Sequence, residues 1–380
     1  MSRARQFMTD TAMMATATAV PRWRRLPALV VQSFAAQWIF FAGPAVYLAT
    51  NWLMLSGLDG YGRAPLLALL MDLVEFSVPA GLVVILVLRL IQYAAIEKPA
   101  SPIMALGGEL REIAVNPVRI VNGLPIFAAM IFFNKAMVEL KPAIPRIVPF
   151  AWDEWLMQLD RTLHFGIDPW VLLQPLLGFD YVTFGFNIAY NFWFLALFGA
   201  WIWFGFRKTA DELRTRFFLS YMIVWWLGGG LLAVAFSSAG PVYYSGIGLS
   251  PDPFTGLFAY LRDVDGRIPI WSLDTQQLLW DGYTGKTAAL GISAFPSMHN
   301  ASAALFALAF WKVSRGAGIA FAIYAAMILI GSVHLGWHYA VDGYAGFALA
   351  AIGWWIAGPI ARWHHGLAAT RRYNESLASL

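Results

Sequence analysis

The segment from Phe295 to Asp342 decides the fold of this chain. It opens FPSMHNASA at residues 295–303, runs through two apolar stretches, and closes within GSVHLGWHYAVDGYAG at residues 331–346. It holds three of the six histidines. Histidine and aspartate are costly to bury in membrane-length segments, so their presence there indicates function. His338 and Asp342 are four residues apart, which places both side chains on one face of a helix.

The composition is that of a membrane protein. Hydrophobic residues make up 59% of the 380 residues and charged residues only 13%. The 18 tryptophans suit aromatic belts at two membrane interfaces. The chain has no cysteine, which excludes disulfides, thiolate metal sites and thiol catalysis. The net charge of +4 comes from basic residues near the ends of apolar segments, so we expect a bilayer and no nucleic acid as partner.

Apolar runs of roughly 17–25 residues are long enough to cross a bilayer. The chain has several such runs, and the fold class we predict is all-α, a polytopic membrane helix bundle of about eight transmembrane helices. The predicted spans are residues 34–56, 65–89, 120–138, 181–206, 216–236, 297–313, 317–335 and 340–361.

The spans predict how the chain is organised. We expect a cytoplasmic N-terminal segment at 1–33, three transmembrane helices within 34–138, an interfacial amphipathic segment at 139–180, a catalytic transmembrane region at 181–362 with an outer loop at 237–296, and a cytoplasmic tail at 363–380.

The interfacial segment contains an amphipathic pattern. Apolar residues recur there at helical spacing, with acidic residues predicted on the opposite side. The pattern indicates a helix lying either on lipid or on the bundle. The apolar positions are Trp152, Trp155, Leu156, Leu159 and Leu163, and the polar ones Asp153, Glu154, Asp160 and Arg161.

The basic residues predict the orientation. Eight spans place both termini on one side, and most of the 26 basic residues fall in inner segments if the N-terminus is cytoplasmic. This bias favours cytoplasmic termini. The outer loop and the two histidine motifs would then face the periplasmic side of a bacterial inner membrane.

Two histidines and a carboxylate at one membrane surface suit nucleophilic attack on phosphorus. Imidazole is a good nucleophile near neutral pH because its ordinary pKa is about 6.5. Asp342 would hold the tautomer of His338, and His299 would protonate the leaving alkoxide and then activate the acceptor. Helix starts at 297–299 and at His338 would direct free N–H groups at the phosphate.

These residues resemble two signature motifs of the type-2 phosphatidic acid phosphatase superfamily. Pro296-Ser297-Met298-His299 is similar to a Pro-Ser-Gly-His motif, and Gly336 to Asp342 is similar to Gly-x-His-x-x-x-Asp. The resemblance covers residues 181–361 and implies a six-helix lipid-phosphatase core. It implies that His338 becomes a phosphohistidine, that Asp342 assists it, that His299 is the general acid and base, and that Ser297 lies near the phosphate.

The chain departs from this superfamily where cations should hold phosphate. A Lys-x6-Arg-Pro motif should end the fifth span, but Ala233 and Gly240 stand at its basic positions, and Ser332 replaces the arginine of the third motif. Lys135-x5-Lys141-Pro142 is similar to that missing motif but lies two helices too early, and we interpret it as chance.

Loss of those cations, together with the stretch 152–166, resembles the branch that contains inositol phosphorylceramide synthase. That branch moves a phosphorylated headgroup from a lipid to an alcohol on another. We therefore expect a phospholipid donor, a lipid or alcohol acceptor, and no cofactor or metal. The alternative is hydrolysis of phosphatidic acid or of a polyprenyl (di)phosphate. The substrate-binding residues we predict are Ser297, Gly336, His334, Tyr243, Tyr244 and Lys286, with Arg262 and Arg267 as further sources of charge.

Two other classes of function stay open. His299, His334, His338 and Asp342 would serve as ligands of zinc or iron in a metal-dependent membrane hydrolase, although the glutamate base of HExxH is missing. Asp72 and Glu75, with Lys135 as an ion-pair partner, would serve a transporter, although no internal repeat is visible.

Overall fold

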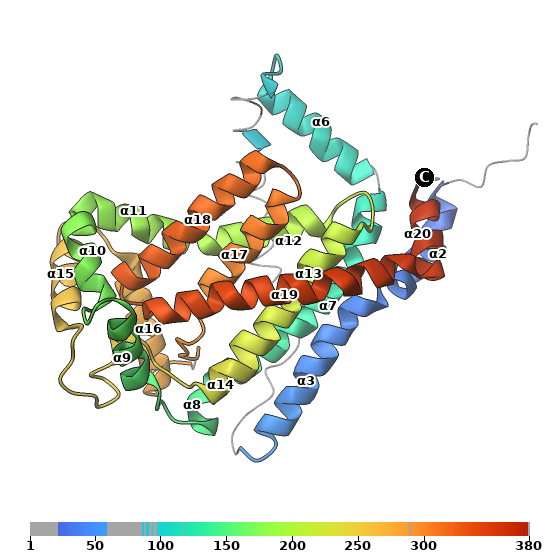
Figure 1. The fold of residues 1–380 in the computed structure, drawn as a ribbon. Coiled ribbons are helices and arrows are strands. Elements are labelled where there is room, and N and C mark those ends of the chain that lie inside the picture. The colour runs from blue at the N-terminus through green and yellow to red at the C-terminus, as the bar shows by residue number, and fades with distance from the viewer. Residues whose placement is uncertain are drawn as a thin grey trace, which may run out of the picture.

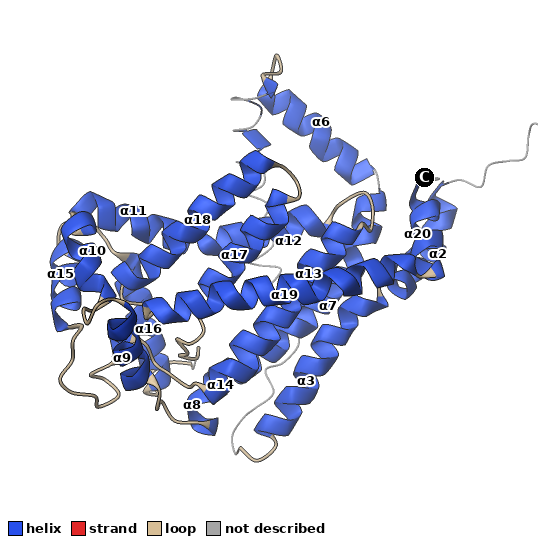
Figure 2. Cartoon of the chain, in the orientation of Figure 1, coloured by secondary structure: helices blue, strands red, loops and turns tan. Residues whose placement is uncertain are grey.

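The computed structural model describes residues 22–58, 97–115, 117–288 and 290–378, with isolated positions 86, 89, 90 and 93. Within these ranges every regular element is a helix (Figures 1 and 2). The predicted span 65–89 falls almost entirely outside the described residues, and so do Asp72 and Glu75.

Six helical segments of the described chain are long and apolar enough to cross a membrane. Each overlaps a predicted span, although Val118–Ile147 runs past the predicted end at 138 into the segment predicted to be interfacial. The overlap confirms the all-α bundle and indicates an integral membrane protein. The segments are Trp38–Leu55, Val118–Ile147, Asp180–Gly205, Glu212–Ala235, Arg315–His334 and Ala340–Gly366. They are built mainly from α3 (Ala42–Leu55), α7 (Pro117–Leu140), α11 (Asp180–Asn191), α12 (Trp193–Gly205), α13 (Glu212–Trp226), α18 (Arg315–His334) and α19 (Ala340–Gly366).

The predicted span 297–313 is the shorter helix α17 (Met298–Trp311). At 1.5 Å per residue its 14 residues reach about 21 Å, less than the roughly 30 Å of bilayer hydrocarbon. It packs against α13, α18 and α19 (Figure 1). The core of the molecule is therefore the group of helices that carries both histidine motifs.

A glycine-rich turn lets these helices approach closely. After α13 the chain continues as a π-helical turn, Leu227–Leu232, and the short helix α14 (Ala233–Ala235). A Cβ atom on Gly228 would lie 2.4 Å from Leu349 and 2.9 Å from Met298. A larger side chain at this position would force the Leu349 and Met298 side chains to shift.

The segment 139–180 packs on the bundle rather than standing away from it. It contains a 3₁₀ turn, η4 (Lys141–Ala143), and the helices α8 (Ile144–Ile147), α9 (Asp153–Leu163) and α10 (Pro169–Leu177). The polar face predicted for α9 is partly wrong, because Asp153 and Asp160 are buried with Leu156 and Met157. Trp155 and Leu163, predicted to be apolar contacts, are about half exposed.

The two ends of the described chain lie together. Helix α2 (Arg22–Ala36) packs beside α20 (Ala368–Ala378), as Figure 1 shows. The Tyr373 hydroxyl donates to Ser33 Oγ at 3.0 Å, and Thr370 Oγ1 donates to the Ala36 carbonyl at 3.3 Å. The two described ends of the chain are therefore packed side by side in the fold.

A fully buried arginine anchors this end of the bundle. Arg214 donates to Gln37 Oε1 at 2.6 Å, to the Asn122 carbonyl at 2.7 Å and to the Phe204 carbonyl at 3.1 Å. Among the described residues no carboxylate lies within ion-pair distance of its guanidinium. Backbone and amide oxygens from α7, α12 and the residue before η1 (Trp38–Phe41) therefore carry the interaction.

We expect Arg214→Met to destabilise the protein by roughly 2–5 kcal/mol, because it leaves several buried acceptors unpaired. The measurement is the thermal midpoint in detergent, read by size-exclusion recovery. Arg315→Met, at the exposed start of α18, is the matched control. Equal midpoints for the two variants would show that the buried network is not needed.

Candidate active site

The histidines of the two motifs lie close together. His299 is the second residue of α17, and His338 stands just before α19. Their ring centroids are 6.4 Å apart, with the planes inclined at 55°. One phosphoryl group is small enough to contact both rings over that separation.

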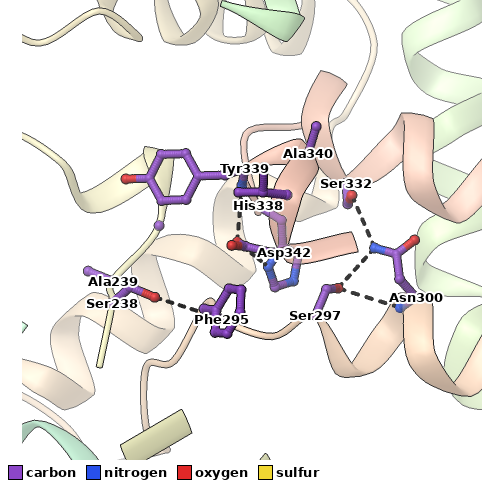
Figure 3. Close-up of polar contacts among 12 residues, drawn as sticks. Ser238, Ala239, Phe295, Ser297, Asn300, Ser332, His338, Tyr339, Ala340 and Asp342 are labelled. Carbon is purple, nitrogen blue, oxygen red and sulfur yellow. Dashed lines mark hydrogen bonds and ion pairs between the residues drawn. The ribbon is translucent and has the colours of Figure 1, made fainter. Parts of the chain in front are cut away.

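His338 is oriented by the first turn of α19. Its Nδ1 lies 3.2 Å from Asp342 Oδ2, which also accepts the Tyr339 N–H at 3.1 Å (Figure 3). An acid at this position caps the start of a helix, so Asp342 both caps α19 and orients the His338 ring. A carboxylate can only accept a hydrogen bond, so we assign the ring proton of His338 to Nδ1, the nitrogen beside Asp342. The other ring nitrogen, Nε2, then carries the lone pair. Burial lowers the pKa of His338 and keeps the ring neutral.

Serine and asparagine side chains connect the two motifs. Ser297 caps α17, and its Oγ accepts from Asn300 Nδ2 at 2.9 Å. Asn300 also donates to Ser332 Oγ at 3.3 Å (Figure 3). The Ser332 carbonyl accepts the N–H groups of Trp337 and His338. The Ser297 N–H in turn donates to the Asp342 carbonyl at 3.0 Å, so the start of α17 is fixed relative to α19.

Aromatic rings surround His299. Tyr190 stacks on its imidazole with centroids 4.7 Å apart, and the Trp193 ring lies at 4.2 Å. Trp193 Nε1 also donates to the His299 carbonyl at 3.2 Å. Within the described part of the chain the imidazole itself has no hydrogen-bond partner. Stacking therefore positions the ring while both nitrogens stay available to a substrate.

Two aspartates of α9, which the sequence pattern placed only on a polar helix face, hold the segments around His338 and Gly240. Asp160 accepts the N–H groups of Ala340 at 2.7 Å and Val341 at 2.9 Å. Asp153 accepts from the N–H groups of Ala239 and Gly240 and from the Tyr339 hydroxyl. The only sequence signal was their seven-residue spacing, which places both carboxylates on one helix face.

These contacts correct the prediction that free N–H groups at the start of α19 face the phosphate. The N–H groups of Tyr339, Ala340 and Val341 already bind Asp342 and Asp160. When carboxylates accept the first N–H groups of a helix, they also neutralise the partial positive charge at its N-terminus. The anion must therefore be held by other groups.

The positions that lost their cations are buried or sterically closed. Gly240 has φ +97°, and a Cβ there would lie 2.9 Å from the Trp337 carbonyl oxygen. Ser332 is fully buried, and its hydroxyl donates to the Leu329 carbonyl. A side chain is sterically excluded at Gly240, and a cation at Ser332 or at the third position, Ala233, would be fully buried, so loss of the cations agrees with the packing.

Among the described contacts, the remaining predicted substrate-binding residues do not join His338. His334 is buried and bonds Thr183 through Nε2 at 2.8 Å. Gly336 adopts φ +71° against Phe258. The others lie in the outer loop. The Tyr243 hydroxyl donates to the Gln276 carbonyl, and the Tyr244 ring packs on Phe254. Lys286 forms an ion pair with Asp281 and Arg267 one with Asp180, while Arg262 is exposed.

The proposed metal ligands do not converge in this structure. His334 bonds Thr183 instead of turning toward His338. Among the described residues, no three histidine, aspartate or glutamate side chains are arranged as ligands of one ion. Lys135, considered as a partner of Asp72 and Glu75, forms an ion pair with Glu139.

Comparison with known families identifies the class of protein. Residues 154–356, which are 203 of the 380 residues, match the model of the PAP2 superfamily, and the chain belongs to that superfamily. Comparisons with curated proteins and with solved structures gave no match. Membership confirms the predicted superfamily and makes the protein an enzyme of the lipid phosphatase or phosphotransferase type. The matched range begins in α9 and includes Asp160.

The burial of Asp160 leads us to predict that the thermal stability of the protein depends on pH. Burial raises the pKa of Asp160 from 3.8 to about 7, against the effect of its backbone hydrogen bonds. The folded protein therefore binds one more proton than the unfolded chain between pH 4 and 7, and stability is lost as pH rises through 7. We expect the thermal midpoint of the wild type to fall between pH 5.5 and 8.5, and that of Asp160→Asn to fall less.

The control for this measurement is Asp263→Asn, at an exposed carboxylate of α15 (Thr255–Asp265). It should keep the wild-type slope. A wild-type midpoint that rises with pH, or equal slopes in all three proteins, would contradict the role given to Asp160.

Proposed function

We propose that the protein transfers a phosphorylated headgroup from a phospholipid to an alcohol through a phosphohistidine on His338. The observation that carries this proposal is the His338–Asp342 hydrogen bond, with the His299 ring close to that of His338. The hydrogen bond at Nδ1 leaves Nε2 as the nucleophile. Its lone pair attacks phosphorus and the bond to the lipid alkoxide breaks.

His299 donates a proton in the first half-reaction and accepts one in the second. In the first, the protonated imidazole gives its proton to the leaving alkoxide, and Asp342 stabilises the positive charge that develops on His338. In the second, neutral His299 takes the proton of the acceptor hydroxyl. The acceptor oxygen then attacks phosphorus, and the bond to Nε2 breaks to restore the enzyme.

The missing cations support a phosphodiester donor. A dianionic monoester needs several positive groups around its oxygens, because electrostatic stabilisation is usually the largest catalytic term. A diester carries a single negative charge and requires fewer. Since the packing closes Gly240 and Ser332 to cations, transfer from a phospholipid headgroup fits this site better than hydrolysis of phosphatidic acid. The branch resemblance at 152–166 favours a phosphoinositol-like headgroup.

Trapping the intermediate tests the proposal. A donor labelled at phosphorus should leave acid-labile, base-stable label on the wild type and none on His338→Ala. Loss of the nucleophile should reduce turnover by roughly 10⁴-fold or more, and His299→Ala should slow it by about 10²- to 10⁴-fold. His365→Ala, at the far end of α19, is the control. Turnover that EDTA abolishes and zinc restores would favour the metal-dependent hydrolase instead.

The acceptor decides between transfer and hydrolysis. We expect label to move to an added lipid or polyol alcohol in preference to water. Release of inorganic phosphate from phosphatidic acid, with every alcohol ignored, would establish a plain lipid phosphatase that uses the same histidines.

The proposed orientation puts this site on the periplasmic face of a bacterial inner membrane, with cytoplasmic termini. The chain contains no cysteine, so single cysteines report topology directly. Cysteine at exposed Ser245, in the outer loop, should react with an impermeant maleimide in intact cells. Cysteine at exposed Ala369, in α20, should react only after lysis. The reverse pattern would invert the orientation.

A further inference from the structure

A phosphate between His299 and His338 requires a positive charge that the outer loop does not supply. Arg267 is bound to Asp180 and Asp263, and Lys286 to Asp281, all at the surface. The substituted motif positions are closed by packing, and the start of α19 is neutralised by carboxylates. The cation must therefore come from another element of the fold.

Lys141 is placed to provide it. It follows α7 and begins η4, and its backbone lies directly against the loop that leads into α17. A Cβ on Gly291, which has φ +84°, would lie 2.6 Å from the Lys141 carbonyl carbon and 2.7 Å from Pro142 N. Three residues further on, the backbone of Ala294 interacts with the His338 ring. The same short loop thus touches Lys141 and the nucleophile.

The charge of Lys141 acts on both histidines. It interacts electrostatically with His299 and with His338, and for His338 it is the second cause, after burial, of a lowered pKa. No carboxylate of the described residues forms an ion pair with Lys141, and the side chain is partly buried. An ammonium group removed from water without a counter-ion is unfavourable, and an anionic ligand relieves that cost.

We propose that Lys141 binds the phosphate group of the substrate between His299 and His338 and replaces the cations missing from the superfamily motifs. This inference rests on the proposed function, since it concerns the same site. It replaces our interpretation of Lys141-Pro142 as chance. Lys141 lies outside residues 154–356, the range matched by the superfamily model, so the match assigns it no role.

The proposed role of Lys141 is electrostatic stabilisation of the phosphate group. Its ammonium group would donate to a non-bridging phosphate oxygen and stabilise the charge that builds on the oxygens as Nε2 of His338 attacks. It neither gains nor loses a proton. One cation suits a monoanionic diester, so this assignment agrees with the donor class proposed above.

Anion binding tests the assignment without requiring turnover. Orthovanadate and inorganic phosphate are titrated into the purified full-length protein, and binding is read from tryptophan fluorescence, since Trp193 lies against His299. We expect Lys141→Met to weaken binding by roughly 10- to 100-fold, the loss of one charged hydrogen bond. Lys141→Arg should stay within about threefold of wild type because it keeps the charge. The control is Lys312→Met, at the exposed opposite end of α17.

The outcomes separate this inference from the proposed function. Equal affinities for Lys141→Met and wild type would overturn the role of Lys141, and so would a wild type that binds neither anion. A third outcome is possible, in which anion binding depends on Lys141 but the protein never forms phosphohistidine. That result would support the role of Lys141 and refute the proposed function. Should Lys141→Met fail to fold, Lys141→Gln and the charge-retaining arginine variant supply the same comparison.

Discussion

The site depends on carboxylates that hold the first turn of α19. Asp342 accepts from Tyr339 and His338, and Asp160 accepts from Ala340 and Val341. Helix N–H groups without partners are costly inside a protein. Hydrogen bonds from these N–H groups to the two aspartates fix the residue at which α19 begins and the orientation of the His338 ring. Because α9 supplies Asp160, a short helix outside the long membrane-length helices helps to fix the position of the His338 ring.

This arrangement has an electrostatic consequence for the substrate. A helix start is usually available to anions, but the start of α19 already binds two carboxylates. Packing at Gly240 and Ser332 excludes arginine or lysine from the positions where other members of the superfamily are expected to carry them. The site therefore has aromatic walls and little positive charge. These features suit the weakly charged phosphodiester proposed above as the donor.

The sequence predicted the features that local rules control. Apolar runs located six spans because bilayer thickness sets helix length, and the four-residue spacing placed Asp342 beside His338. It did not predict which way α9 faces, since Asp153 and Asp160 point inward to bond N–H groups more than 85 residues away in the chain. Nor did it show that Asn300 donates to Ser332, or that the Lys141 backbone lies against the loop before α17, because both depend on tertiary packing.

The central claim is that His338 Nε2 attacks phosphorus between two histidines, and a structure with orthovanadate tests it most directly. Vanadate adopts the five-coordinate geometry of phosphorus at the transition state. The account predicts vanadium bonded to His338 Nε2, an oxygen facing the His299 ring, and Asp342 still on Nδ1. Vanadate bound away from His338, or a metal ion coordinated by the two histidines, would contradict it.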